Sequence, residues 1–373
     1  MIVLIPFNKP CVIGEEATAV QEAIEHTKLS GNGPFGKKCT DWLEARLQCE
    51  KVILTPSCTA ALEMTTLLTE VGEEDEVIMP SYTFVSTANA FALRGTAIRF
   101  VDIEPNTMNI SPSEIEAAIT DKTKAIVIVH YAGISCDMDA IMDIANRYGL
   151  WVIEDAAQAL FSSYKGRPLG TIGHFGAISF HETKNFTCGE GGALIVNRPE
   201  AVERAEILQE KGTNREQFFK GMVDKYTWRD VGSSYLLSDL NAAYLSVQLQ
   251  HADLINKSRL RAWNQYYYGL LDLPEVEVPH VPSDCHHNAH MFYIKTNQQQ
   301  ELIEYLKKHD IMAVTHYVPL HSSHAGMKFG KFIGEDQFTT TESEKIVRLP
   351  LYFGIGKEAV DDVVTHIQAF FNT

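Results

Sequence analysis

Three short segments carry side chains that could do chemistry, and each follows a run of apolar residues. The first, Thr55-Pro-Ser-Cys-Thr-Ala60, puts small and hydroxyl-bearing residues where an expected strand leads into an expected helix. Free backbone N–H groups at the start of a helix favour anions, phosphate in particular. An ordinary helix cap by Ser57 or Thr59 explains the same residues, and for this segment alone it is the favoured interpretation.

The second segment, Val152-Ile-Glu-Asp-Ala-Ala-Gln158, ends an apolar strand in carboxylates. Asp155 would lie at the sheet edge where α/β proteins bind ligands, and a carboxylate there can hold a protonated ring nitrogen. Successive side chains of a strand point to opposite faces, so Glu154 is not expected to share the site of Asp155. In isolation, a helix cap explains Asp155 equally well.

The third segment, residues 177–185 (Ala-Ile-Ser-Phe-His-Glu-Thr-Lys-Asn), runs from an apolar strand to Lys184. A Gly-rich turn at residues 188–192 then leads into another apolar strand. Burial between such strands would lower the pKa of the lysine and leave a neutral amine that can attack carbonyl groups. A surface-loop lysine is the alternative. The turn lacks the G-x-G-x-x-G spacing of nicotinamide sites, which argues against that cofactor.

Strands and helices must alternate to bring these segments together, and the sequence from Val52 to Val196 has that pattern. Apolar runs predict strands at residues 52–54, 77–79, 98–101, 125–129 and 151–153. Helical patterns occupy residues 59–68, 87–93, 112–119 and 138–147. The alternation predicts an α/β fold, with a mostly parallel sheet covered on both faces and a binding crevice at the carboxyl ends of its strands.

The sequence after Ser238 has a different pattern. Ser238 and Asp239 can cap one long helix that continues towards Leu271 and could join two domains. A strand at residues 291–294 and helices at residues 299–308 and 357–371 complete the chain. We expect a large domain of residues 1–247 and a smaller α+β domain of residues 248–373, with which residues 1–14 could pack.

Composition excludes several classes of partner. The chain has 373 residues and a formal net charge of −16, and so acidic a surface repels nucleic-acid backbones. No apolar run approaches the ~20 residues of a membrane helix, and the first residues lack the features of a secretory signal. The 7 cysteines are scattered without a C-x-x-C pair, which favours a reducing compartment. We expect a cytoplasmic protein that binds neither nucleic acid nor membrane.

In this order, the three segments resemble the DegT/DnrJ/EryC1/StrS family of sugar-nucleotide aminotransferases. The resemblance runs from about Ile5 to the last expected helix. It includes Pro80-Ser-Tyr-Thr-Phe-Val-Ser-Thr-Ala-Asn89, Val129-His-Tyr-Ala-Gly133 and His316-Tyr-Val-Pro-Leu-His321. It implies the type I (aspartate-aminotransferase-like) fold of transferases that use pyridoxal 5′-phosphate (PLP), with a seven-stranded sheet. It also implies a homodimer with shared active sites, or a tetramer.

The resemblance assigns roles at the cofactor ring. Lys184 would bond to PLP and later move a proton between substrate and cofactor. Asp155 would pair with the ring nitrogen, Gln158 would lie against the ring oxygen, and Phe84 would stack on the ring face. Pyridoxamine phosphate (PMP) would carry the amino group between the two half-reactions.

The resemblance also implies a phosphate site. Thr59, Ala60 and Ser179 would hold the phosphate within one subunit. Many relatives add an Asn from the partner subunit in a G-Y-N-Y-R-M stretch, where this chain has Gly232-Ser-Ser-Tyr-Leu-Leu237. Ser234 would replace that Asn, and its shorter side chain puts the contact between subunits in doubt.

Three further segments resemble one group of family members in particular. They are residues 54–64, 211–215 and 223–235. They resemble family members that move the amino group of L-glutamate to C4 of dTDP-4-keto-6-deoxy-D-glucose in the synthesis of enterobacterial common antigen. The candidates for contacts with the sugar nucleotide are His181, Arg229, His316 and Tyr317. Arg229 could equally be a solvated or interface residue, and His316 and Tyr317 could belong to a packed strand end.

Several alternatives stay open. The same chemistry could act at C3, yield a gluco product or use a UDP-sugar. Sugar dehydratases of the same fold carry histidine in place of Lys184, and regulators of this fold carry a basic DNA-binding extension that an acidic chain lacks. His286 and His290 have the spacing of a helical zinc pair, but the strand-like residues that follow argue against a metal site.

Overall fold

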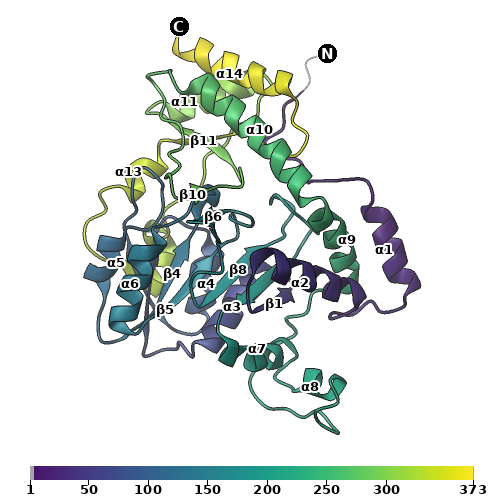
Figure 1. Cartoon of the computed structure of the whole chain (residues 1–373). Coiled ribbons are helices and arrows are strands. Elements are labelled where there is room, and N and C mark those ends of the chain that lie inside the picture. The colour runs from purple at the N-terminus through teal and green to yellow at the C-terminus, as the bar shows by residue number, and fades with distance from the viewer. Residues whose placement is uncertain (1–3, 373) are drawn as a thin grey trace.

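The computed structural model describes residues 4–372, and its centre is an 8-stranded sheet with the strand order β1-β9-β8-β5-β4-β2-β3-β12 (Figure 1). Residues 1–3, where the apolar start of the chain begins, and residue 373 lie outside the described part. The strands of this sheet are β1 (Lys51–Thr55), β2 (Glu76–Pro80), β3 (Ala97–Val101), β4 (Thr123–Val129), β5 (Trp151–Asp155), β8 (Phe175–Ser179), β9 (Gly192–Val196) and β12 (Gly330–Phe332).

The sheet is mostly parallel, as the alternating sequence pattern predicts. Strand β9 is antiparallel to both of its neighbours, β1 and β8, while the other pairs from β8 to β12 are parallel. Seven strands were expected, and the eighth is β12, a three-residue strand from the C-terminal third that pairs with β3. So short a strand carries no periodic signal in the sequence.

Helices cover both faces of the sheet, and two separate apolar cores lie between the layers. On one face α3 (Cys58–Leu68), α4 (Val85–Ala92) and α7 (Val202–Gln209) pack on the strands. On the other lie α2 (Pro34–Leu47), α5 (Pro112–Ala118), α6 (Met138–Tyr148) and α9 (Asp239–Gln250), with α1 (Glu16–Glu25) packed on α9. The strands alternate between these cores: in β5, Val152 belongs to the second and Ile153 to the first.

Local signals in the sequence fix the starts of several helices. The Ser57 hydroxyl accepts a hydrogen bond from the amide of Ala60 at the start of α3, and Asp137 does the same for Ala140 in α6. Helix α6 ends at Gly149, whose φ of 67° is a left-handed conformation that glycine adopts without strain. The predicted helices of the sheet region therefore agree with the observed ones to within a few residues.

The prediction of a single long helix after Ser238 is wrong in one respect. Ser238 caps α9 as predicted, but the helix ends before His251 and a second helix, α10 (Ala252–Leu270), follows. His251 has φ −102° and ψ 16°, outside the helical range. In Figure 1, α9 lies beside the sheet, and α10 rises from it to the layer that contains both described chain ends.

A third apolar cluster lies in the C-terminal layer. It is built from α10, α11 (Gln299–Lys308), α14 (Lys357–Phe371) and the antiparallel pair β11 (Phe292–Lys295) and β13 (Ile346–Leu349). Ile5 belongs to this cluster and pairs with Ile311. The division of the chain at residue 247 stays a prediction.

The remaining elements are short. They are α8 (Arg215–Phe219), α12 (His324–Phe329) and α13 (Thr339–Ser343), and a small sheet of β6 (Ser163–Tyr164), β7 (Arg167–Pro168) and β10 (Cys285–His286). Among residues 4–372, no helix combines the length and the apolar character that a membrane crossing requires.

Candidate active site

A cavity of about 560 Å³ lies at the carboxyl ends of the parallel strands, between the sheet and the C-terminal layer. Nine of the predicted site residues line it: Thr59, Phe84, Asp155, Gln158, Ser179, His181, Lys184, His316 and Tyr317. The phosphate candidate, the ring-nitrogen candidate and the lysine therefore share one space, although 125 positions separate Thr59 from Lys184 (184 − 59).

Asp155 ends β5 on the face covered by α3 and α4. Its carboxylate is buried and accepts hydrogen bonds from the Thr87 hydroxyl (2.7 Å) and the Ala157 amide (3.2 Å). Burial raises the pKa of this carboxyl above its ordinary value, and the two hydrogen bonds offset only part of that effect. No cation among residues 4–372 lies within ion-pair distance of it, so the carboxylate is suited to a positively charged group of a ligand.

Lys184 projects from the loop that joins β8 to β9. Backbone hydrogen bonds from Phe180 to Gly191 and from Cys188 to Phe180 close the loop, and the Lys184 amide bonds to His181. Burial lowers the pKa of the Lys184 amine, and Cys58 and Asp155 oppose that shift weakly. The loop therefore presents an amine that is neutral more often than an ordinary lysine.

The start of α3, where the sequence predicts phosphate binding, forms one side of the cavity. Ser57, Cys58 and Thr59 line it, and the hydroxyl of Thr59 donates to Ser86 (2.8 Å). The Ala60 amide is already bonded to Ser57 (3.1 Å), and Ala60 is not among the lining residues. The hydroxyls and the free amides at the helix start suit a phosphate better than Ala60 does.

Aromatic side chains form another part of the cavity lining. Tyr317 stacks on His316, with ring centroids 3.6 Å apart, and the Tyr131 hydroxyl bonds to Nδ1 of His316 (2.8 Å). The exposed ring of Phe84 lies 6.0 Å from the Tyr317 ring. Gln158 donates a hydrogen bond to the Tyr317 hydroxyl (2.9 Å). Gln158 and Phe84, the two residues predicted to contact the cofactor ring, therefore both contact Tyr317.

Comparison with known proteins identifies the family of this chain. The sequence profile of the DegT/DnrJ/EryC1/StrS aminotransferase family matches residues 10–368. The chain belongs to this family. It is therefore a PLP-dependent aminotransferase, from a family whose members act on nucleotide sugars.

Its relatives match over nearly their whole lengths. The spore coat polysaccharide biosynthesis protein SpsC of Bacillus subtilis is 32% identical over 375 positions, which cover 98% of this chain and 96% of that protein. The structure of the aminotransferase TlmJ from Streptoalloteichus hindustanus has a TM-score of 0.92 at 27% identity, and 99% of each chain is covered. The PLP form of the putative sugar aminotransferase Spr1654 from Streptococcus pneumoniae has a TM-score of 0.88 at 26% identity, with 98% of each chain covered.

Two predicted residues of this DegT-family chain lie away from the cavity. Ser234 borders a separate hollow beside Asn32 and Glu210, and its backbone pairs with that of Glu210. Arg229 is exposed, and its amide bonds to the Gly212 carbonyl. Within one subunit, neither residue reaches Lys184.

His286 and His290, whose spacing resembles that of a helical zinc pair, are not on a helix. His286 belongs to strand β10, while Nδ1 of His290 bonds to Asn185 (3.0 Å) and His290 lines the cavity. In the described part of the chain, no cluster of three or more histidine, cysteine or acidic side chains could hold a metal ion.

Sequence reasoning missed three residues that shape the cavity. Thr87 orients Asp155 and lies in the segment at residues 80–89 that carries part of the family resemblance. Arg259 and Arg348 line the cavity from the C-terminal layer. Arg348 is a lone charge within an apolar strand, Ile346-Val-Arg-Leu349, and that irregularity was an available signal.

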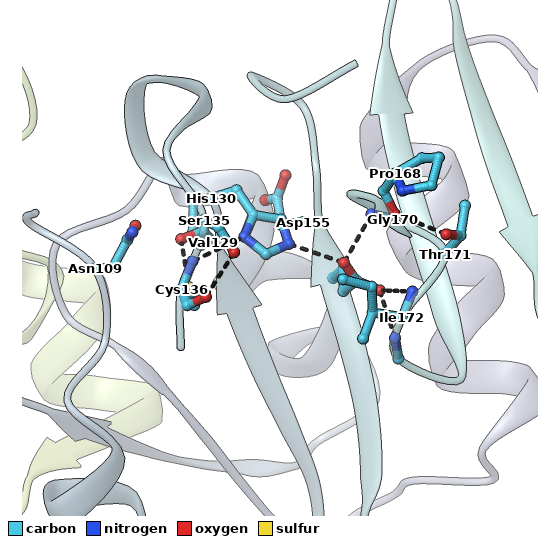
Figure 2. A network of polar contacts seen from close by, with 12 residues as sticks. Asn109, Val129, His130, Ser135, Cys136, Asp155, Pro168, Gly170, Thr171 and Ile172 are labelled. Carbon is cyan, nitrogen blue, oxygen red and sulfur yellow. Dashed lines mark hydrogen bonds and ion pairs between the residues drawn. The ribbon is translucent and has the colours of Figure 1, made fainter. Parts of the chain in front are cut away.

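A buried hydrogen-bond network supports the strand that presents Asp155. Glu154 points to the opposite face from Asp155, where its carboxylate accepts from Nε2 of His130 (2.8 Å) and from the amides of Gly170 and Ile172 (2.7 Å each). The Cys136 amide donates to Nδ1 of His130, which fixes the proton on Nε2 (Figure 2). Both carboxylate oxygens of Glu154 thus accept hydrogen bonds. The alternation of the strand correctly predicted that Glu154 and Asp155 do not share a site.

We expect Glu154→Gln to destabilise the fold by about 3 kcal/mol, because an amide group would face donors that now bond to a carboxylate. Urea unfolding at neutral pH measures the loss. Glu275→Gln is the matched control, since Glu275 is exposed and has no recorded partner in the described chain. Equal stability of the two variants would contradict a structural role for the Glu154 network.

The lowered pKa of Lys184 predicts a pH dependence for attachment of PLP. A lower pKa leaves more neutral amine at a given pH, so attachment to Lys184 should rise at lower pH than attachment to the exposed Lys307. Cofactor-free protein is incubated with PLP across a pH series, reduced with borohydride and analysed by peptide mass spectrometry. Coinciding profiles for the two lysines would mean that the Lys184 amine is not desolvated.

Proposed function

We propose that this chain transfers the amino group of L-glutamate to C4 of dTDP-4-keto-6-deoxy-D-glucose. The products are dTDP-4-amino-4,6-dideoxy-D-galactose, a precursor for a cell-surface polysaccharide such as enterobacterial common antigen, and 2-oxoglutarate. The observation that carries the reaction type is the meeting of Lys184 and Asp155 in one cavity. The choice of sugar is supported by the sequence resemblance at residues 54–64, 211–215 and 223–235.

The residues of the cavity fit PLP. Asp155 is a buried carboxylate without a cation, and a protonated ring nitrogen would supply one. Thr59, Ser179 and the start of α3 would hold the phosphate, while Phe84 would cover the ring. When bound, PLP supplies an aldehyde that bonds to amines and a ring that delocalises the electron pair left by loss of a proton.

Lys184 would move the proton. Nζ can accept a proton from the α-carbon of the amino donor and later deliver one to C4 of the sugar, and burial favours the accepting form of the amine because it lowers the pKa of Lys184. Tyr317 and His316 line the cavity with their stacked rings and would limit the access of water. The face from which Nζ reaches C4 decides between a galacto and a gluco product.

A homodimer, or a tetramer of two such dimers, would complete the site. The segment between α7 and α9 exposes large apolar side chains, among them Phe219 (62%), Met222 (68%) and Trp228 (80%). Exposed apolar surface of this kind favours a partner. In a dimer, Ser234 and Arg229 of this segment would approach the partner's cavity, the first towards the PLP phosphate and the second towards the nucleotide.

Product analysis tests the substrate. PLP-loaded protein is incubated with dTDP-4-keto-6-deoxy-D-glucose and L-glutamate, and the product is examined by NMR. We expect an axial amine at C4. An equatorial amine would keep the enzyme class and overturn the galacto product, whereas no amine would point to the C3 or UDP-sugar alternatives. Lys184→Ala is the control, and it should bind PLP without turnover.

The partnership between Asp155 and the ring nitrogen predicts a large rate effect. We expect Asp155→Ala to lower kcat at least about 100-fold, since it removes the charge that stabilises the protonated ring. Steady-state kinetics with saturating PLP measure the change, and Asp272→Ala, at an exposed site, is the matched control. A loss of only a few-fold would mean that the ring nitrogen has another partner.

A further inference from the structure

Two arginines line the cavity of this strongly acidic chain. The charged side chains that line it are Lys184, Arg259 and Arg348 on the one hand and Asp155 and Glu190 on the other. Glu190 lies 3.6 Å from the ring of His181 at the β8–β9 loop. The formal charge of the whole chain is −16, so the two arginines beside Lys184 stand out as groups that could bind an anion.

The guanidinium of Arg259 already forms hydrogen bonds within the protein. This group is buried and donates to three backbone carbonyls, those of Ala289, His290 and Leu351. Burial lowers the pKa of Arg259 to about 10. These hydrogen bonds join α10 to the turn before β11, so the role of Arg259 is structural.

Arg348 is held differently. Its backbone lies in β13 opposite Tyr293 and exchanges two hydrogen bonds with Val314, so the side chain starts from a fixed point. Nε donates to the Thr315 carbonyl (3.2 Å), and the guanidinium lies over the ring of Phe7, 4.7 Å from its centroid. The carbonyl and the ring together fix the plane of the guanidinium.

The two terminal nitrogens of Arg348 have no recorded hydrogen bond within residues 4–372, and no carboxylate there forms an ion pair with them. A guanidinium has five N–H donors in a planar fork that matches two oxygens of one carboxylate or phosphate. The surrounding groups do not neutralise it, because burial raises the pKa values of Tyr82 and Tyr131 and lowers that of His316.

We propose that Arg348 binds an oxyanion of a substrate in this cavity, either a carboxylate of the amino donor or a phosphate of the sugar nucleotide. The inference rests on the proposed function, since both substrates of that reaction are anions. Arg348 is close enough to lower the pKa of the Lys184 amine by its charge. That proximity favours the donor carboxylate, which is attached directly to the reacting carbon.

Calorimetry with two simple anions tests the binding role. The probes are 2-oxoglutarate for the carboxylate and dTDP for the phosphate, titrated into PMP-loaded wild type, Arg348→Met and Arg348→Lys. For one probe, we expect Arg348→Met to bind about 10- to 100-fold more weakly and Arg348→Lys to recover part of the affinity. Arg261→Met is the control, because Arg261 is exposed on α10 outside this cavity and the charge change is the same.

The two half-reactions assign the source of the oxyanion. Single-turnover spectra with L-glutamate follow the first, and spectra of the PMP form with the keto-sugar follow the second. A defect confined to the first assigns Arg348 to the donor carboxylate, and a defect confined to the second assigns it to the nucleotide phosphate. If Arg348→Met is folded and equals wild type with both probes, whether both bind or neither does, the proposal is overturned.

This design separates the proposal from the named reaction. Failure of wild type to aminate dTDP-4-keto-6-deoxy-D-glucose would refute the proposed substrate. The comparison of Arg348 variants with 2-oxoglutarate and L-glutamate would still decide the role of Arg348. A thermal unfolding curve shows that each variant is folded, and the intact backbone bonds of β13 make a native fold the expected result.

Discussion

Two adjacent carboxylates at the end of β5 are both buried, but they differ in how fully the protein satisfies their hydrogen-bonding capacity. Glu154 faces the α2–α6 side, where a histidine and backbone amides satisfy it completely. Asp155 faces the α3–α4 side with two hydrogen bonds and, among residues 4–372, no cation within ion-pair distance. The first carboxylate fixes the end of the strand, and the second remains available to a ligand. The chemistry of the cavity depends on this division.

The cavity has walls of different origin. The sheet region contributes Asp155, Lys184, Phe84 and the start of α3, while the C-terminal part of the chain contributes His316, Tyr317 and the two arginines. Arg259 joins α10 to the turn before β11, and Tyr131 and Gln158 of the sheet region bond to His316 and Tyr317. Groups that would act on the cofactor thus lie on one layer, and groups suited to anionic substrates lie largely on the other.

Much of the sheet region could be predicted because its signals are local. Apolar runs, caps such as Ser57 and the alternation of β5 are legible in neighbouring residues. The strand β12 was not predictable, since it depends on pairing with the distant β3, and no local signal marks the break at His251. Arg348 carried one local signal, a lone charge in an apolar strand, but only the folded chain reveals that its terminal nitrogens lack a partner among residues 4–372. The proposed roles of Ser234 and Arg229 would require a second subunit, which the fold of one chain does not place.

The segment just after residue 4 has an unusual consequence for sequence tolerance. Chain ends usually accept substitution freely because little packs against them. Here Ile5 pairs with Ile311, and Phe7 and Asn8 reach the cavity, where Phe7 covers the face of Arg348. Substitutions in this stretch should therefore be constrained as those of an interior loop are, and its variation among relatives should follow the anion that each one binds.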